Sequence, residues 1–128
     1  KDVSKTLVYA LCEYRNQINR VIPERIIQRA PSAKLRPNQT DQDSLPPYEI
    51  LDAIIEAYIE KNYSPAEIIA LNYSKADVNK VIHLIHRNEY KRRQSPPGIR
   101  ITHCDFGTAW HYPITSSYQV WSTQSRDE

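Results

Sequence analysis

Glycine is scarce in this sequence of 128 residues: Gly98 and Gly107 are the only two, and methionine does not occur. Glycine-rich turns let backbone N–H groups approach phosphates closely, so the sequence lacks a loop that many nucleotide sites use. If the chain takes part in nucleotide chemistry, its phosphate-binding loop must lie in another stretch of polypeptide. We therefore expect the chain to be a piece of a larger protein and to be inactive by itself.

Other absences exclude further classes of protein. No apolar run approaches the roughly 20 residues that cross a bilayer, and the N-terminal stretch carries charge on both sides of a short apolar patch, unlike a signal peptide. The two cysteines, Cys12 and Cys104, have no CxxC or CxxH spacing, which argues against zinc and redox motifs and favours a reduced, cytoplasmic setting. The sequence thus predicts neither a membrane protein nor a cysteine-based metal site.

The amino-acid composition is that of an ordinary soluble domain. Apolar residues make up 40% of the chain and charged residues 25%, with a net charge of +2. Such a chain can bury one modest core, and its charge is too weak to require a nucleic acid partner.

Apolar residues recur at three- and four-residue steps, which indicates helices. Helices are expected over about 3–19, 22–29, 48–62, 65–71 and 75–93. The fold class is therefore mainly α, with about five helices, and the first of them should be buried on one side. Ile99–Thr102 alternates like one short strand, and residues 96–128 as a whole read as an extended C-terminal arm.

Two serines mark helix starts. Ser64 and Glu67 fit a capping box, in which the serine side chain accepts an N–H of the first turn and the glutamate reaches back. Ser74 and Asp77 resemble a weaker version of the same cap. Both pairs place a helix directly after the serine.

The segment 31–47 is a long loop with four prolines and few apolar residues. Loops of this length inside compact domains are commonly functional. Its alternate carboxylates, Asp41 and Asp43, resemble part of a calcium loop, but the glycine and the closing glutamate of such a loop are missing. The four histidines also lack partners at metal spacing, so no metal site is predicted.

The helices expected over 65–71 and 75–93, joined by a tight turn, outline a helix-turn-helix. In a DNA-binding version, Lys75, Asn79, Lys80 and His83 would face the major groove. Any two packed helices need such a turn, however, and the chain has no basic stripe. A nucleic-acid-binding module is therefore the alternative hypothesis from another functional class.

Tyr90, Lys91, Arg92 and Arg93 form a basic cluster at the end of the last expected helix. Cations there are favoured by the helix dipole, which explains them without any ligand. A phosphate-binding role explains them equally well, because an amine and guanidinium groups make strong hydrogen bonds to pyrophosphate. The residues alone leave both interpretations open.

Four blocks, read together, resemble one known family. They are KTLVYAL from Lys5, IPERII from Ile22, APSAKLRPNQTDQDSLPPYEILDAI from Ala30 and NEYKRRQSPPGIRIT from Asn88. Their order and spacing resemble the C-terminal part of glutamine-dependent NAD+ synthetase. The resemblance implies a parent built from a nitrilase-like amidase and a Rossmann-like α/β synthetase domain of the ATP-pyrophosphatase type, with residues 1–95 supplying helices of that domain.

The resemblance also implies a reaction and its partners. The parent would be a carbon–nitrogen ligase of NAD biosynthesis that uses ATP, Mg²⁺ and glutamine-derived ammonia to amidate deamido-NAD+, as a cytoplasmic homo-oligomer. No catalytic residue and no metal ligand is expected in this chain, because the family's pyrophosphate loop, Mg²⁺-binding acidic residues and amidase triad precede Lys1.

The residues that match the family's binding motifs are few. Lys5 and Ser32 correspond to positions that contact ATP, and Tyr90 and Lys91 to a pair that contacts deamido-NAD+. The segment 33–45 resembles a mobile loop that orders over the active site when substrates bind, in agreement with the interpretation of 31–47 as a functional loop.

Overall fold

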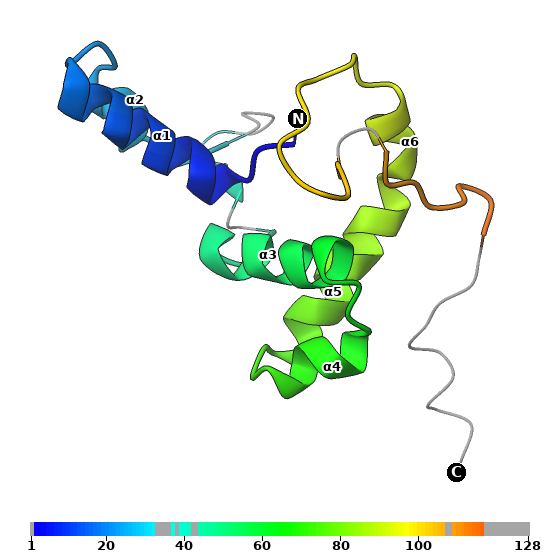
Figure 1. Cartoon of the computed structure of the whole chain (residues 1–128). Coiled ribbons are helices and arrows are strands. Elements are labelled where there is room, and N and C mark those ends of the chain that lie inside the picture. Colours follow the sequence, from blue (N-terminus) through cyan, green and yellow to red (C-terminus); the bar gives the residue numbers. More distant parts are fainter. Residues whose placement is uncertain (1, 33–36, 38, 42–43, 107–108, 117–128) are drawn as a thin grey trace. The chain divides into compact units, whose positions relative to one another are not determined.

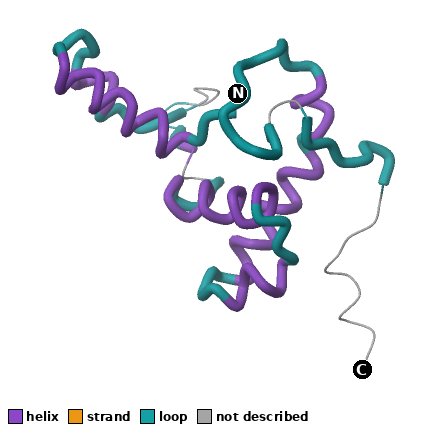
Figure 2. The backbone as a smooth tube through the Cα atoms, viewed as in Figure 1, coloured by secondary structure: helices purple, strands orange, loops and turns teal. Residues whose placement is uncertain are grey.

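The protein is helical. The computed structural model describes residues 2–32, 37, 39–41, 44–106 and 109–116. Its elements are α1 (Lys5–Ile18), α2 (Glu24–Ile27), α3 (Tyr48–Ile55), the π-helix η2 (Glu56–Glu60), α4 (Pro65–Ala70), α5 (Lys75–Arg87) and α6 (Glu89–Arg93) (Figure 1). No strand occurs among the described residues (Figure 2), so the expectation of a mainly α fold is confirmed.

The chain divides into two compact units. One unit comprises residues 3–52, and the other comprises the described residues from 53 onward together with Asp2. The boundary between a helical part and an arm at residue 95 stays a prediction. No helix among the described residues has the length and apolar character that a membrane span needs.

In the first unit, polar side chains fix the start and the end of α1. The Thr6 N–H and hydroxyl both donate to one oxygen of Asp52, at 2.8 Å each. After the helix, the Asn16 amide oxygen accepts the N–H groups of Val21 and Ile22, at 3.1 and 2.9 Å. The turn from α1 to α2 is therefore held by one side chain.

The expectation that α1 is buried on one side is wrong for the described residues. Apolar side chains of its stripe, from Val8 to Ile18, remain 37 to 64% exposed. Apolar periodicity identifies the face of a helix that avoids water, but it does not supply the surface that covers it. Here α2, which packs against α1, is only four residues long.

The second unit holds the buried core. This unit contains the last three residues of α3 (53–55) together with η2, α4 and α5, and α4 packs against α5 (Figure 1). The buried apolar side chains are Ile54, Ala57, Ile59, Ile68, Val78, Val81, Ile82 and Ile85. The last four recur at helical spacing along α5, so the stripe that the sequence predicts for this helix is confirmed.

Two of the expected helices are interrupted. The helix expected over 75–93 appears as α5 and α6, with Asn88 between them. Both the backbone N–H and the side-chain amide of Asn88 donate to the Leu84 carbonyl, at 3.0 and 2.8 Å. Such local side-chain bonds compete with regular helix, which accounts for the break. The helix expected over 48–62 turns into η2 at Glu56.

The strand expected at Ile99–Thr102 is absent. The N–H groups of Ile101 and Thr102 donate to Asp2 at 2.7 Å each, and the Thr102 hydroxyl adds a third bond. The Asp2 carboxylate therefore accepts the backbone hydrogen bonds that a neighbouring strand would accept in a sheet. Burial to 6% exposure would raise the pKa of Asp2, but these three bonds outweigh burial and lower it.

Aromatic rings bring the C-terminal arm onto α5. The His86 ring stacks on Tyr112 with centroids 3.8 Å apart, and its Nε2 lies 2.8 Å from the Tyr58 hydroxyl. Burial lowers the pKa of His86, and the positive charges of His83 and Arg92 lower it further. The folded state therefore favours the neutral imidazole over the protonated one.

The capping box is confirmed, whereas the second cap is not. Glu67 N–H donates to the Ser64 hydroxyl at 3.3 Å, and Ser64 N–H donates to Glu67 at 2.8 Å. Ser74 precedes α5 without a side-chain bond to the helix.

We expect Ser64→Ala to lower the free energy of unfolding by about 1 kcal/mol, because the mutation removes the side chain that caps α4. The matched control Ser74→Ala should change it by less than about 0.5 kcal/mol. Urea unfolding measures both, and equal effects would contradict this account.

Protonation of His86 should destabilise the protein. Below the ordinary histidine pKa of 6.5 the unfolded chain takes up a proton that the folded chain resists, so stability falls as the pH drops from 6.5 toward the lowered value. His86→Gln should therefore flatten the dependence of the unfolding free energy on pH between about 7 and 5. The control His103→Gln, at an exposed position, should keep that dependence. An unchanged slope in His86→Gln would show that another group causes it.

Candidate functional site

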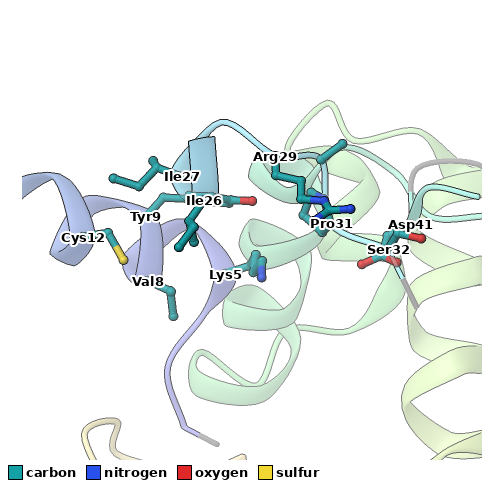
Figure 3. Close-up of a pocket in the computed structure, with 11 residues that line it drawn as sticks. Lys5, Val8, Tyr9, Cys12, Ile26, Ile27, Arg29, Pro31, Ser32 and Asp41 are labelled. Atoms are coloured by element: carbon teal, nitrogen blue, oxygen red, sulfur yellow. The ribbon is translucent and has the colours of Figure 1, made fainter. Parts of the chain in front are cut away.

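A pocket of about 520 Å³ lies in the first unit. Its wall includes Lys5 and Ser32, the two residues that the sequence predicts to contact ATP. One comes from the first turn of α1 and the other from the start of the long loop. Figure 3 shows Lys5 between the apolar side chains of α1 and α2 and the pair Ser32 and Asp41. The fold therefore brings these two predicted residues to one cavity.

The position of Lys5 follows from the helix start. Ser4 caps α1, and the Thr6–Asp52 hydrogen bonds hold the same turn. The Lys5 amine lies 5.5 Å from the centroid of the Tyr9 ring, one helical turn away. In the part of the chain that the structure describes, no carboxylate forms an ion pair with this amine, so its charge is uncompensated at the pocket wall.

Asp41 closes the loop side of the pocket. Its N–H donates to the Pro31 carbonyl at 3.0 Å, so a residue inside the long loop is held next to the first residue of that loop. Its carboxylate accepts the Tyr48 hydroxyl at 2.6 Å. Burial, followed by this bond and the negative charge, raises the pKa of Tyr48 to about 12. The loop expected to be mobile, 33–45, lies partly outside the described residues.

Sequence reasoning missed two features of the pocket. Arg29 lines it beside Pro31 and adds a second cation. Val8, Tyr9, Ile26 and Ile27 give it an apolar wall. Arg29 precedes Ser32 by three residues, and this closeness in sequence was the signal that could have placed Arg29 at the same site. A cavity with cations near an oxygen-rich edge and an apolar wall suits a molecule with a charged part and a flat, weakly polar part.

Tyr90 and Lys91 belong to the second unit. They lie in α6, where the Tyr90 side chain is 45% exposed and the Lys91 side chain is also exposed. The Lys91 amine lies 6.0 Å from the centroid of the Tyr90 ring. The structure thus presents an ammonium beside an aromatic face, and both are open to a ligand.

Arg92 and Arg93 are oriented differently from Lys91. Both guanidinium groups pair with the buried carboxylate of Glu89. Arg92 also donates to the Phe106 carbonyl at 2.6 Å. Burial, followed by the charge of Arg93, lowers the pKa of Arg92 to about 10, far above neutrality. Of the four residues in the basic cluster, only Tyr90 and Lys91 are therefore placed to meet a ligand without breaking internal bonds.

Within the described ranges, no three histidine, cysteine, aspartate or glutamate side chains gather closely enough to hold an ion. Cys12 and Cys104 are free thiols.

Comparison with known proteins identifies the family. Residues 1–95 match the family model described as NAD synthase. The glutamine-dependent NAD(+) synthetase of Aquifex aeolicus is 55% identical over 118 residues, which cover 92% of this chain and 21% of that protein. The corresponding protein of Acinetobacter baylyi is 54% identical over 121 residues, covering 93% of this chain and 22% of its own length.

A solved structure gives the same result. The glutamine-dependent NAD+ synthetase from Acinetobacter baumannii, in complex with ADP, matches with a TM-score of 0.53 and 47% identity. The match covers 89% of this chain and 19% of that one. The chain thus spans about a fifth of the length of the relatives it matches.

These matches also bear on the helix-turn-helix hypothesis. The family match over residues 1–95 includes α4 and α5, and no comparison supports a nucleic-acid-binding role for them. Ile68, Val78 and Ile82 are buried in this pair of helices, so packing in the core accounts for the motif. From its family match and its close relatives, the chain belongs to the NAD synthase family.

Proposed function

We propose that this chain is part of the synthetase half of a glutamine-hydrolysing NAD+ synthetase, which converts deamido-NAD+ to NAD+ at the expense of ATP. The main observation behind this proposal is that Lys5 and Ser32 line the same pocket. The chain is also 55% identical to a glutamine-dependent NAD(+) synthetase over 118 residues. The matched relative bound to ADP adds support, because it shows that a protein of this kind holds an adenine nucleotide.

The proposed chemistry explains why cations matter. A carboxylate is a poor acyl donor, so an oxygen of the nicotinate carboxylate first attacks the α-phosphorus of ATP. The bond to the bridging oxygen breaks, and pyrophosphate leaves. Ammonia from glutamine then attacks the activated carbonyl carbon and loses a proton, and AMP leaves with its bonding electron pair. Negative charge accumulates on the departing phosphates, where cationic side chains stabilise it.

In this proposal, Lys5 and Ser32 bind the phosphates of the nucleotide. Lys5 brings to the pocket wall an amine that pairs with no carboxylate in the described part of the chain, and Ser32 brings a hydroxyl. Charge-assisted hydrogen bonds to phosphate are among the strong polar contacts that a protein makes. ATP is used with Mg²⁺ in this proposal, and the Mg²⁺ ligands lie in sequence outside this chain.

Tyr90 and Lys91 contact deamido-NAD+ in this proposal. An exposed ammonium 6.0 Å from an aromatic ring centroid offers a charge for a pyrophosphate and a flat surface for a ring. The parent would join this helical part to a Rossmann-like α/β core and an upstream amidase domain. The cytoplasmic location and the homo-oligomeric state stay predictions.

Loss of the Lys5 amine should impair use of ATP. In the full-length synthetase, we expect Lys5→Ala to lower kcat/KM for ATP about tenfold or more, the effect of removing one hydrogen bond to a charged group. Lys80→Ala is the matched control, because Lys80 is an exposed lysine of α5 outside the pocket. Steady-state kinetics with ATP varied measure both variants. A Lys5→Ala enzyme indistinguishable from the control would remove Lys5 from the site.

The chain of 128 residues alone should not form NAD+. It lacks a glycine-rich phosphate loop, so ATP, ammonia and deamido-NAD+ supplied together should give no product above background. Chromatographic detection of NAD+ after long incubation tests this expectation. Turnover by the chain alone would mean that its own residues complete the active site, contrary to the proposal.

A further inference from the structure

Glu89 is a buried carboxylate next to the two residues assigned to deamido-NAD+. Its side chain is 1% exposed. One oxygen accepts the Arg93 Nε and His111 Nδ1 at 3.1 Å each, and the other pairs with an Arg92 nitrogen. Removing an ion from water is costly unless opposite charges and hydrogen bonds compensate it. Glu89 is therefore stable in this position only while its partners stay in place.

The same partners hold the C-terminal arm. Arg92 donates to the carbonyls of Phe106 and Trp110, at 2.6 and 3.3 Å, and Arg93 donates to the Tyr112 carbonyl at 2.9 Å. The Arg92 guanidinium also lies 4.3 Å from the Phe106 ring centroid and 5.0 Å from that of Trp110. Glu89 thus orients two guanidinium groups, and these groups connect α6 to the arm.

Helix geometry separates this network from the exposed pair. Residues three and four apart share a face of a helix, so Glu89, Arg92 and Arg93 lie on one side of α6. Tyr90 and Lys91 fall between them in sequence and are exposed. A helix of five residues has little stability of its own, so its geometry depends on tertiary contacts.

We propose that Glu89 is a positioning residue for deamido-NAD+: its ion pairs lock α6 against the arm so that Tyr90 and Lys91 are held ready for the substrate. The proposal rests on the proposed function, which assigns the substrate to these two residues. Glu89 acts through them and does not itself touch the ligand, because its carboxylate oxygens are bound to Arg92, Arg93 and His111.

A double-mutant cycle in the full-length synthetase tests this. Glu89→Gln keeps the shape of the side chain but removes the charge that orients the arginines. We expect it to raise KM for deamido-NAD+ about fivefold to tenfold and to leave KM for ATP within about twofold. Lys91→Ala should raise the same KM about tenfold. If Glu89 acts through Lys91, the double variant should resemble Lys91→Ala alone, because coupled residues are not additive.

Each outcome decides one question. If Lys91→Ala leaves KM for deamido-NAD+ unchanged, the assignment of the substrate fails, and the positioning role fails with it. If Lys91→Ala raises this KM while Glu89→Gln does not, the assignment stands and the positioning role is wrong. Additive effects, or an equal rise of KM for both substrates, would mean that Glu89 supports the enzyme only in a general structural way.

A milder variant covers the case in which Glu89→Gln fails to fold. Arg93 is 43% exposed and contributes one of the bonds to Glu89 and one to the arm. Arg93→Gln should therefore fold and raise KM for deamido-NAD+ in the same direction, about twofold to threefold, with KM for ATP constant. Arg93→Lys, which keeps the charge, should recover part of the loss. No change in Arg93→Gln would overturn the proposal.

Discussion

Carboxylates that accept backbone or cationic donors hold together the parts of this chain that regular secondary structure does not. Asp2 accepts the N–H groups of Ile101 and Thr102, Glu60 accepts that of Cys104, and Asp52 accepts that of Thr6. Glu89 does the same for the arm through its arginine partners. Buried backbone N–H groups need acceptors, and where the described residues form no sheet, side chains must supply many of them. The described residues of the arm, 96–106 and 109–116, depend on these acceptors for their position.

The shortage of glycine has a visible consequence in the turns. Backbone positions with positive φ are occupied by Asn62, Asn72 and Asp105, with φ of 54°, 70° and 47°. Asparagine and aspartate tolerate the left-handed region better than other residues that carry a Cβ atom. Asn72 thereby makes the tight turn between α4 and α5 without glycine. The helical turns are built this way, but the sequence contains no glycine-rich loop of the kind whose backbone N–H groups surround a phosphate.

Local patterns predicted the helices, and long-range contacts explain where those predictions failed. The stripe of α5 and the capping box at Ser64 depend on neighbours within two turns, so the sequence contains all the relevant information. The exposure of α1, the missing strand at Ile99–Thr102 and the hydrogen bond from Arg92 to the Phe106 carbonyl depend on which surfaces meet in space. For the site, family motifs indicated Lys5 and Ser32, whereas the shape of the pocket added Tyr9 and also Arg29, whose one sequence signal was its closeness to Ser32.

The basic cluster shows how burial divides residues of one chemical type into different roles. Lys91 and Arg92 are adjacent cations, yet Arg92 is desolvated against two aromatic rings and an internal carboxylate, while Lys91 remains in solvent. A ligand phosphate would have to replace several bonds to recruit Arg92, whereas Lys91 loses only water. The internal arginines and the exposed lysine therefore complement each other: the pairing of Arg92 and Arg93 with Glu89 gives α6 a fixed geometry, and that geometry determines the direction in which Lys91 can offer its charge.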